Sequence, residues 1–179
     1  STVAAMFEEL GVPVFDADAV VRRLQGPGGA LVNAIEAEFP GTTGEAGVDR
    51  AMLGTRVFGD AAALARLEAL VHPAVRAARR EFLIEHGGLP LVVFDIPLLF
   101  EKGGFEEVDA VAVVSASADV QRGRVLARPG MTPERFAQIL ALQTPDAEKR
   151  ARADYLIDTG TTHAETRAVV AELVKKLAP

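Results

Sequence analysis

The sequence lacks cysteine, long apolar runs and an excess of basic residues. Without cysteine the chain can form neither a disulfide framework nor a thiolate metal site or nucleophile, which favours a cytoplasmic location. No apolar run approaches the ~20 residues that a membrane-spanning helix needs, and no signal-peptide pattern opens the chain. A net charge of -6 argues against nucleic-acid binding, which usually uses a strongly basic face. We therefore expect neither a membrane nor a nucleic-acid partner.

The remaining composition is that of a soluble globular protein. The 179 residues are 49% hydrophobic and 25% charged, and sixteen glycines and ten prolines separate many short elements. A chain of this length can bury one substantial core. We expect one core domain with small appendages.

Apolar strands alternate with helical patterns along the chain. Helices are predicted over residues 1–10 with Gly11 as the stop, through most of residues 20–86 with N-caps at Asp49 and Asp60, and after Ser117, Thr132 and Thr144. A last helix is predicted from the Thr162–Glu165 capping box to about residue 177. Strands are predicted over residues 12–15, 89–94, 111–114 and 155–157. Strands that are apolar throughout and separated by helices indicate a parallel sheet covered on both faces, hence an α/β fold.

Four aspartates follow the predicted strands: Asp16, Asp18, Asp95 and Asp158. In open parallel sheets, ligands bind beyond the carboxyl ends of the strands, so these side chains are candidates for a site. Aspartate is also a preferred N-cap where a strand turns into a helix. For any one of the four, capping explains its presence at least as well.

The segment from residue 121 to 152 carries a local excess of positive charge. It holds seven basic residues, Arg122, Arg124, Arg128, Arg135, Lys149, Arg150 and Arg152, against three acidic ones, Glu134, Asp146 and Glu148. Arg124 and Arg128 are four apart, which places them on one face of a helix, and Pro129-Gly130 breaks the chain after them. The pattern suits a mobile flap that holds phosphates, because guanidinium groups match phosphate oxygens in pairs. A solvated basic helix face is the commoner alternative.

Ser1-Thr2 leads directly into an apolar-faced helix, as the end of a G-x-x-x-x-G-K-[ST] phosphate loop does. A helix with no strand before it has no connection into a parallel sheet. We therefore expect a strand and the rest of such a loop, roughly a dozen residues in total, ahead of Ser1.

Several motifs, in order along the chain, resemble the dephospho-coenzyme A kinase family. They are Ser1-Thr2-Val3-Ala4, Asp16-Ala17-Asp18, His72-Pro73, Asp95-Ile96-Pro97-Leu98-Leu99-Phe100-Glu101, Arg124 with Arg128, Gln143, Ala153-Asp154 and Ile157-Asp158. The resemblance implies a P-loop kinase core (residues 1–19, 87–120 and 153–179), a helical domain for the coenzyme A precursor (20–86) and a helical lid (121–152). The family commonly has Asn where this chain has Thr159, which puts the adenine contact there in doubt.

The resemblance also implies the reaction and its residues. ATP would donate its γ-phosphoryl group to the ribose 3′-hydroxyl of dephospho-coenzyme A, with Mg²⁺ as cofactor. Asp18 would accept the hydroxyl proton, while Asp16 supports the turn, and Arg124 with Arg128 would clamp the ATP phosphates. Ser1 and Thr2 would belong to the phosphate loop, with Ser1 on Mg²⁺, and Arg122 would be solvated.

The same resemblance assigns the other binding residues. His72, Pro97 and Leu98 would contact the acceptor, Asp95 would hold a metal-bound water or position the acceptor, and Gly160 would admit the adenine. Two alternatives stay open: His72 as a helix-start histidine bonded to backbone, and Gly160 as an ordinary turn glycine. Leu99 and Phe100 are expected in the core.

Two rival functions are compatible with these patterns. One is a different small-metabolite or nucleoside monophosphate kinase on the same fold, because a fold does not fix the acceptor. The other is a nucleotide-binding relative that has lost turnover. Against the second stands the joint presence of Asp18, Arg124 and Arg128, for which a non-catalytic protein has no chemical need.

Overall fold

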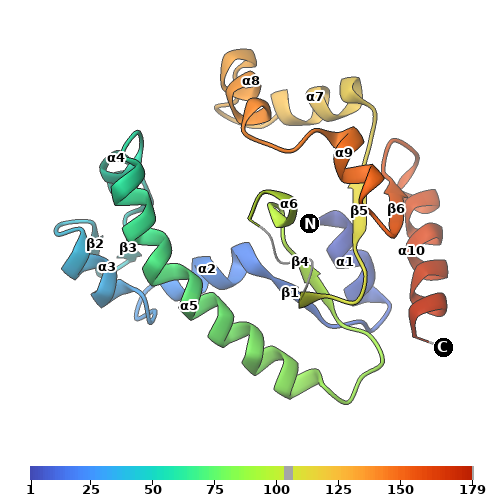
Figure 1. The fold of residues 1–179 in the computed structure, drawn as a ribbon, viewed down its shortest axis with the longest axis horizontal. Helices are drawn as coiled ribbons and strands as arrows, with labels where there is room; N and C mark the ends of the chain where they lie inside the picture. The colour runs from blue at the N-terminus through green and yellow to red at the C-terminus, as the bar shows by residue number, and fades with distance from the viewer. Residues whose placement is uncertain (103–106, 179) are drawn as a thin grey trace. The chain divides into compact units, whose positions relative to one another are not determined.

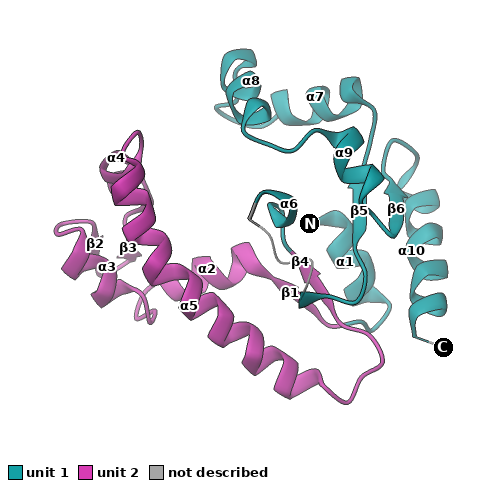
Figure 2. Cartoon of the chain, in the orientation of Figure 1, with its two compact units in different colours: residues 1–12, 96–179 teal, residues 13–95 magenta. Residues whose placement is uncertain are grey.

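The computed structural model describes residues 1–102 and 107–178, and the chain forms two compact units (Figure 2). One unit comprises residues 1–12 and 96–179, and the other comprises residues 13–95. Each unit contains one parallel pair of strands with helices packed on it, so the predicted α/β class with parallel strands is confirmed. That the two pairs belong to one sheet stays a prediction. In the described part of the chain, no helix is both long and apolar enough to cross a membrane.

The strand pair of unit 13–95 joins two segments that are far apart in the sequence. Strand β1 (Val14–Asp16) runs parallel to β4 (Val93–Asp95), with Phe15 beside Phe94 and Asp16 beside Asp95. Phe82 of the long helix α5 (Ala61–His86) covers this pair, with ring centroids 5.6 Å from Phe15 and 6.1 Å from Phe94. The aromatic contacts fix α5 against the strands that end in the candidate carboxylates.

The rest of unit 13–95 is mainly helical, as predicted. Helices α2 (Ala17–Gln25), α3 (Val32–Glu38) and α4 (Arg50–Val57) pack against α5 (Figure 1). Their shared core consists of Leu31, Ile35, Phe39, Val48, Leu53 and Ala63. The predicted N-caps are confirmed, since the carboxylates of Asp49 and Asp60 accept backbone N–H groups at the starts of α4 and α5.

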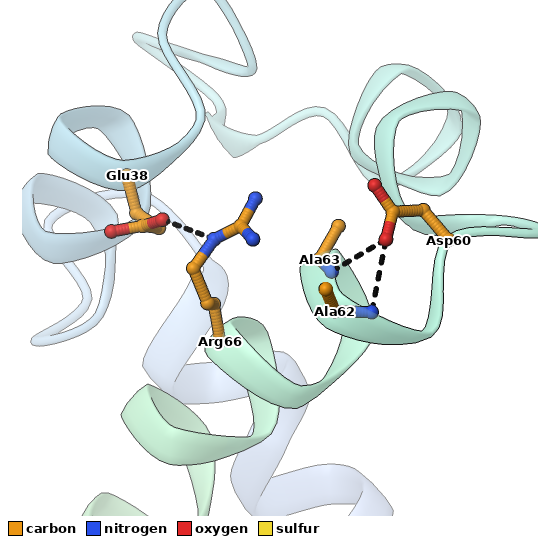
Figure 3. A network of polar contacts seen from close by, with 5 residues as sticks. All are labelled: Glu38, Asp60, Ala62, Ala63 and Arg66. Atoms are coloured by element: carbon orange, nitrogen blue, oxygen red, sulfur yellow. Dashed lines mark hydrogen bonds and ion pairs between the residues drawn. The ribbon is translucent and has the colours of Figure 1, made fainter.

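Polar contacts hold α3 and α5 together at the surface of this core. The Arg66 Nε of α5 donates to the Glu38 Oε1 of α3 at 2.6 Å, close to the Asp60 cap (Figure 3). The Arg66 guanidinium also lies 5.9 Å from the centre of the Phe39 ring. Both partners of the ion pair are partly exposed, so packing of the core beneath them contributes more to stability.

Two features of this unit differ from the sequence prediction. A short hairpin, β2 (Thr43–Gly44) with β3 (Gly47–Val48), interrupts the helical region. Its two-residue strands are too short to produce a periodic pattern. Its place is set by the Glu36 carboxylate, which accepts the Gly41 N–H at 2.8 Å and the Thr43 hydroxyl at 2.8 Å.

The second difference concerns Pro73, which lies inside α5 instead of starting a helix. Proline removes one intrahelical hydrogen bond, but the apolar residues Leu67, Leu70, Val71 and Ala74 on both sides of it pack against the same core. That shared burial keeps the helix continuous. The alternative of a helix-start histidine at His72 is therefore wrong, because this side chain is exposed in the middle of α5, whereas the acceptor contact stays a prediction.

The strand pair of the other unit is covered by the two terminal helices. Strand β5 (Ala112–Ser115) runs parallel to β6 (Tyr155–Asp158), with Ser115 beside Asp158. Helix α1 (Thr2–Glu9) packs against α10 (His163–Leu177) through buried residues that include Met6, Phe7 and Val170. Gly11 follows α1 with φ 79°, which confirms the predicted glycine stop. The predicted Thr162–Glu165 capping box is also present at the start of α10.

Four short helices complete this unit: α6 (Leu99–Lys102), α7 (Ala118–Leu126), α8 (Pro133–Ala141) and α9 (Asp146–Ala151). Ser117 and Thr132 cap α7 and α8 as predicted. Pro145 occupies the N-cap of α9, one residue outside the expected first helical position.

The predicted helical pairing of Arg124 with Arg128 is wrong. Helix α7 ends at Leu126, so Arg124 lies in its last turn and Arg128 lies beyond its end. The physical reason is Pro129, whose ring disfavours helical backbone at the residue before it. The two arginines are therefore not held together by one helix face.

Candidate active site

Two of the predicted carboxylates meet at the ends of β1 and β4. Asp16 and Asp95 are direct neighbours in the parallel register. The Asp16 Oδ1 accepts the Ala19 N–H at 2.8 Å and so caps α2, and its Oδ2 lies 3.8 Å from the Arg22 Nη2. The expectation that Asp16 supports the turn is confirmed.

Asp18 is placed differently from its neighbour. It lies in the first turn of α2 and is exposed, and its carboxylate makes no hydrogen bond or ion pair with any residue that the structure describes. Because Asp16 already provides the cap, capping does not explain Asp18. The positive end of the helix dipole favours a carboxylate here, which leaves an accessible anionic group beside the strand ends.

The ends of β5 and β6 form a second polar region, in the other unit. The buried Ser115 hydroxyl donates to both carboxylate oxygens of Asp146 at 2.9 Å. Thr159, which follows β6, donates its backbone N–H at 2.8 Å and its hydroxyl at 3.1 Å to the Ser115 carbonyl. Asp158 accepts the Gly160 N–H at 2.7 Å, which closes a tight turn.

Arg124 joins α7 to this turn. Its Nη1 donates to the Thr159 hydroxyl at 3.1 Å and its Nη2 donates to the Thr159 carbonyl at 2.6 Å. The side chain of Thr159 is thus engaged with Arg124 and Ser115, at the position where the family commonly carries Asn. Arg124 is exposed, so its contact with Thr159 can exchange for a contact with a ligand.

A cavity of about 230 Å³ lies beside these residues. Residues of β5, α7, α8, α9, the α8–α9 connection and the turn after β6 line it: Val114, Ser115, Ala116, Gln121, Arg124, Leu140, Gln143, Thr144, Asp146, Lys149 and Thr159. Its wall combines the cations Arg124 and Lys149 with hydroxyl and amide groups and with the carboxylate of Asp146, which Ser115 holds. This set of donors can hold an anionic, hydrogen-bonding ligand such as a nucleotide.

Sequence reasoning gave no role to a largely buried ion pair at the edge of this cavity. The Lys149 Nζ lies 2.8 Å from the Glu101 Oε1, and the two side chains are 17% and 13% exposed. Burial by itself raises the pKa of Glu101, but hydrogen bonds from Lys149 and the Thr144 N–H outweigh it and hold the pKa below the ordinary value. Glu101 is the last residue of the family motif at residues 95–101, and Lys149 belongs to the basic segment 121–152. No sequence spacing predicts that these two side chains are in contact.

The remaining predicted residues have these positions. Ser1 caps α1, with its Oγ accepting the Ala4 N–H at 3.2 Å, and Thr2 is the exposed first residue of that helix. Pro97 and Leu98 are exposed in the turn before α6, where they can contact a ligand. Leu99 and Phe100 are only half-buried, and the Phe100 ring lies 5.0 Å from the Arg152 guanidinium carbon, so neither belongs to the buried core.

A metal held by protein ligands alone has no candidate site among the described residues, because no three His, Asp or Glu side chains gather there. The oxygen donors at Ser1 and Asp95 are of the type that Mg²⁺ takes when it keeps most of its waters and binds phosphates. The donor chemistry therefore fits a nucleotide-bound Mg²⁺ better than a resident metal cage.

Comparisons with known proteins show the family to which the chain belongs. A family model described as dephospho-CoA kinase matches residues 1–165. The chain is 70% identical to the dephospho-CoA kinase of Novosphingobium aromaticivorans over 177 residues, covering 99% of this chain and 88% of that protein. It is 55% identical to the dephospho-CoA kinase of Mesorhizobium japonicum over 179 residues, covering 99% and 90%.

Solved structures give the same result for the fold. The crystal structure of a Thermus thermophilus protein matches with a TM-score of 0.84 and 35% identity, over 97% of this chain and 90% of that one. The dephospho-CoA kinase of Campylobacter jejuni matches with a TM-score of 0.66 and 22% identity, over 99% and 90%, which shows the shared fold alone. By its sequence and its fold, this chain belongs to the dephospho-CoA kinase family.

Proposed function

We propose that this chain transfers the γ-phosphoryl group of ATP to the ribose 3′-hydroxyl of dephospho-coenzyme A, giving coenzyme A and ADP. The observation that carries the proposal is the accessible Asp18 carboxylate beside the strand ends, in a chain of this family. The acceptor oxygen bonds to the γ-phosphorus as the bond to the ADP oxygen breaks, and the hydroxyl proton passes to Asp18. Such transfers depend mainly on alignment and charge neutralisation.

The acceptor side is assigned to residues 20–86 together with the segment after β4. Asp18 orients the 3′-hydroxyl and takes its proton, which a carboxylate at a fixed helix start is suited to do. His72, exposed on α5, and the exposed Pro97 and Leu98 contact the acceptor. Asp95, beside Asp16 in the register, positions the acceptor or a metal-bound water.

The donor side is assigned to the cavity between β5, the lid segment 121–152 and the turn after β6. Gly160 continues the turn whose Thr159 lines this cavity, so the adenine lies against that backbone. Arg124 exchanges its contact with Thr159 for the ATP phosphates, and Arg128, exposed beyond the end of α7, approaches them separately. Both guanidinium groups offset the charge that develops between donor and acceptor.

Ser1 and Thr2 complete the donor side as the start of the helix that follows a phosphate loop. Bound with ATP, Mg²⁺ neutralises charge on the phosphate oxygens. The Ser1 hydroxyl and the Asp95 carboxylate are the side chains that we assign to it. We assign the reaction to the cytoplasm, which the lack of cysteine favours.

A substrate panel tests the proposal. ADP release is measured with ATP and either dephospho-coenzyme A, AMP or thymidine monophosphate, and mass spectrometry identifies the phosphorylated product. We expect rapid turnover with dephospho-coenzyme A and formation of its 3′-phosphate. Faster turnover with either nucleoside monophosphate would assign the chain to the rival kinase class. Nucleotide binding without turnover on any acceptor would assign it to the non-catalytic class.

A further inference from the structure

The Glu101–Lys149 ion pair differs from the other ion pairs of its unit in its burial. Its side chains are 13% and 17% exposed, whereas Glu172 and Lys175 of α10 form a 2.7 Å pair with 73% and 72% exposure. An exposed pair contributes little, because water screens it. Removing one partner of a largely buried pair leaves the other charge poorly compensated, which is unfavourable.

The same carboxylate also holds the backbone that leads into α9. The Glu101 Oε1 accepts the Thr144 N–H at 2.9 Å in addition to its contact with Lys149. Its Oε2 is buried and has no hydrogen-bond partner among the described residues. One oxygen of Glu101 therefore fixes two points of the chain, one on each side of the start of α9.

A second contact holds α9 against the strand pair. The Ser115 hydroxyl at the end of β5 donates to both oxygens of Asp146, the first residue of α9. Helix α9 is thus tied to β5 through Asp146 and to α6 through Lys149. We find no such buried polar contact for α8 among the residues that the structure describes.

Both points that Glu101 fixes belong to the wall of the 230 Å³ cavity, which Thr144 and Lys149 line. Because Glu101 holds two of the lining residues, it fixes their positions in the cavity wall before a ligand binds. Preorganisation of this kind lowers the free energy that binding has to supply. Glu101 itself does not line the cavity, so any effect on a ligand passes through Thr144 and Lys149.

We propose that Glu101 is a positioning residue for the donor nucleotide: it fixes Lys149 and Thr144 in the cavity wall, which makes α9 part of the rigid unit. This inference rests on the proposed function, because the cavity is taken as the ATP site. A purely structural ion pair is the alternative, and it predicts loss of stability without a selective effect on ATP.

The test uses conservative variants of the pair in the full chain. Glu101→Gln keeps the size of the side chain and an oxygen for the Thr144 N–H but removes the charge that Lys149 requires. Lys149→Met removes the cation and keeps most of the apolar stem. The double variant measures their coupling, and Glu172→Gln in the exposed pair is the matched control. For each protein, KM for ATP, KM for dephospho-coenzyme A, kcat and the melting temperature are measured.

We expect each single variant to raise KM for ATP about tenfold, the change that ~1.4 kcal/mol produces, with KM for dephospho-coenzyme A within about twofold of the wild type. The KM of the double variant for ATP should be no higher than that of the more impaired single variant, because each single substitution already removes the Glu101–Lys149 contact. Glu172→Gln should leave all constants unchanged.

Two results would overturn the proposal. One is an unchanged or lower KM for ATP in a folded Glu101→Gln protein. The other is a fall in melting temperature with normal kinetic constants at a temperature where the variant is folded, which would assign the pair to stability alone. A wild type that phosphorylates no dephospho-coenzyme A would refute the proposed function, and direct ATP binding by calorimetry would still decide the role of Glu101.

Discussion

Replacing Asp18 by asparagine separates catalysis from helix capping. Asparagine keeps the size of the side chain and one acceptor oxygen but cannot take a proton at neutral pH. Asp18 is exposed in the first turn of α2 and has no polar partner in the described part of the chain, so no native contact is broken. The main structural loss is a negative charge near the helix N-terminus, which is worth about 0.3–1 kcal/mol.

The two expected effects differ greatly in size. For a domain of this length, a loss of that charge lowers the melting temperature by roughly 1–4 °C. Removing a general base typically lowers turnover ~10²- to 10⁴-fold, which corresponds to about 3–5 kcal/mol of activation free energy. We therefore expect Asp18→Asn to keep its fold and its affinity for ATP and to lose most of its turnover with dephospho-coenzyme A.

Asp16→Asn is the matched control, two residues away at the same helix start. Asparagine and aspartate are equally good N-caps, and the 3.8 Å contact with the half-exposed Arg22 is weak, so this variant should resemble the wild type in stability. Calorimetry with ATP, steady-state turnover and thermal melting are measured on both variants. Near-normal turnover in a folded Asp18→Asn protein would refute the role given to Asp18 and make Asp95 the next candidate.

The remaining predictions concern the lid, the acid response and the core. Arg124→Ala should lower turnover about 10²-fold, whereas Arg122→Ala, exposed on the same helix, should change it little; equal losses would refute this division. Hydrogen bonds from backbone and hydroxyl groups lower the pKa of Glu36 from 4.5, so its stabilising contribution should be present above that pH and lost as the pH falls through the folded-state pKa. The free energies of unfolding of wild type and Glu36→Gln, measured with urea, should therefore converge at acid pH. A difference between them that stays constant with pH would contradict the linkage. Ile35→Ala, at 0% exposure, should cost about 2–5 kcal/mol in the same assay, and Ile84→Ala, at 84% exposure, less than about 0.5 kcal/mol; similar losses would contradict the assigned core.

Local chemistry was readable from the sequence wherever a few adjacent residues decide the structure. The caps at Asp49, Asp60, Thr132 and the Thr162–Glu165 box were predicted correctly, because capping is a contact between residues two or three positions apart. The apolar strands and their parallel pairing followed from hydrophobic runs separated by helical patterns. Motif order along the chain also sufficed to predict the family.

The sequence also misled where two local rules compete. A helix start at His72-Pro73 was left open, but burial of apolar residues on both sides of Pro73 keeps α5 continuous. Arg124 and Arg128 read as one helix face, but Pro129 ends the helix between them. In each case proline weakens the helix locally, by removing a hydrogen bond or by restricting the backbone of the preceding residue. Whether the helix continues then depends on the packing of the residues around the proline.

What only the tertiary structure decided is which distant residues share a contact. The sequence alone does not distinguish the roles of Asp16 and Asp18, which are both aspartates after the same strand. The geometry of α2 makes Asp16 the N-cap and leaves the Asp18 carboxylate accessible to a ligand. Glu101 and Lys149 are 48 positions apart, and their largely buried contact forms because α6 and α9 meet in the fold. Caps and strands depend on contacts between near neighbours, which the sequence specifies directly, whereas the wall of the cavity depends on packing between elements from across the chain.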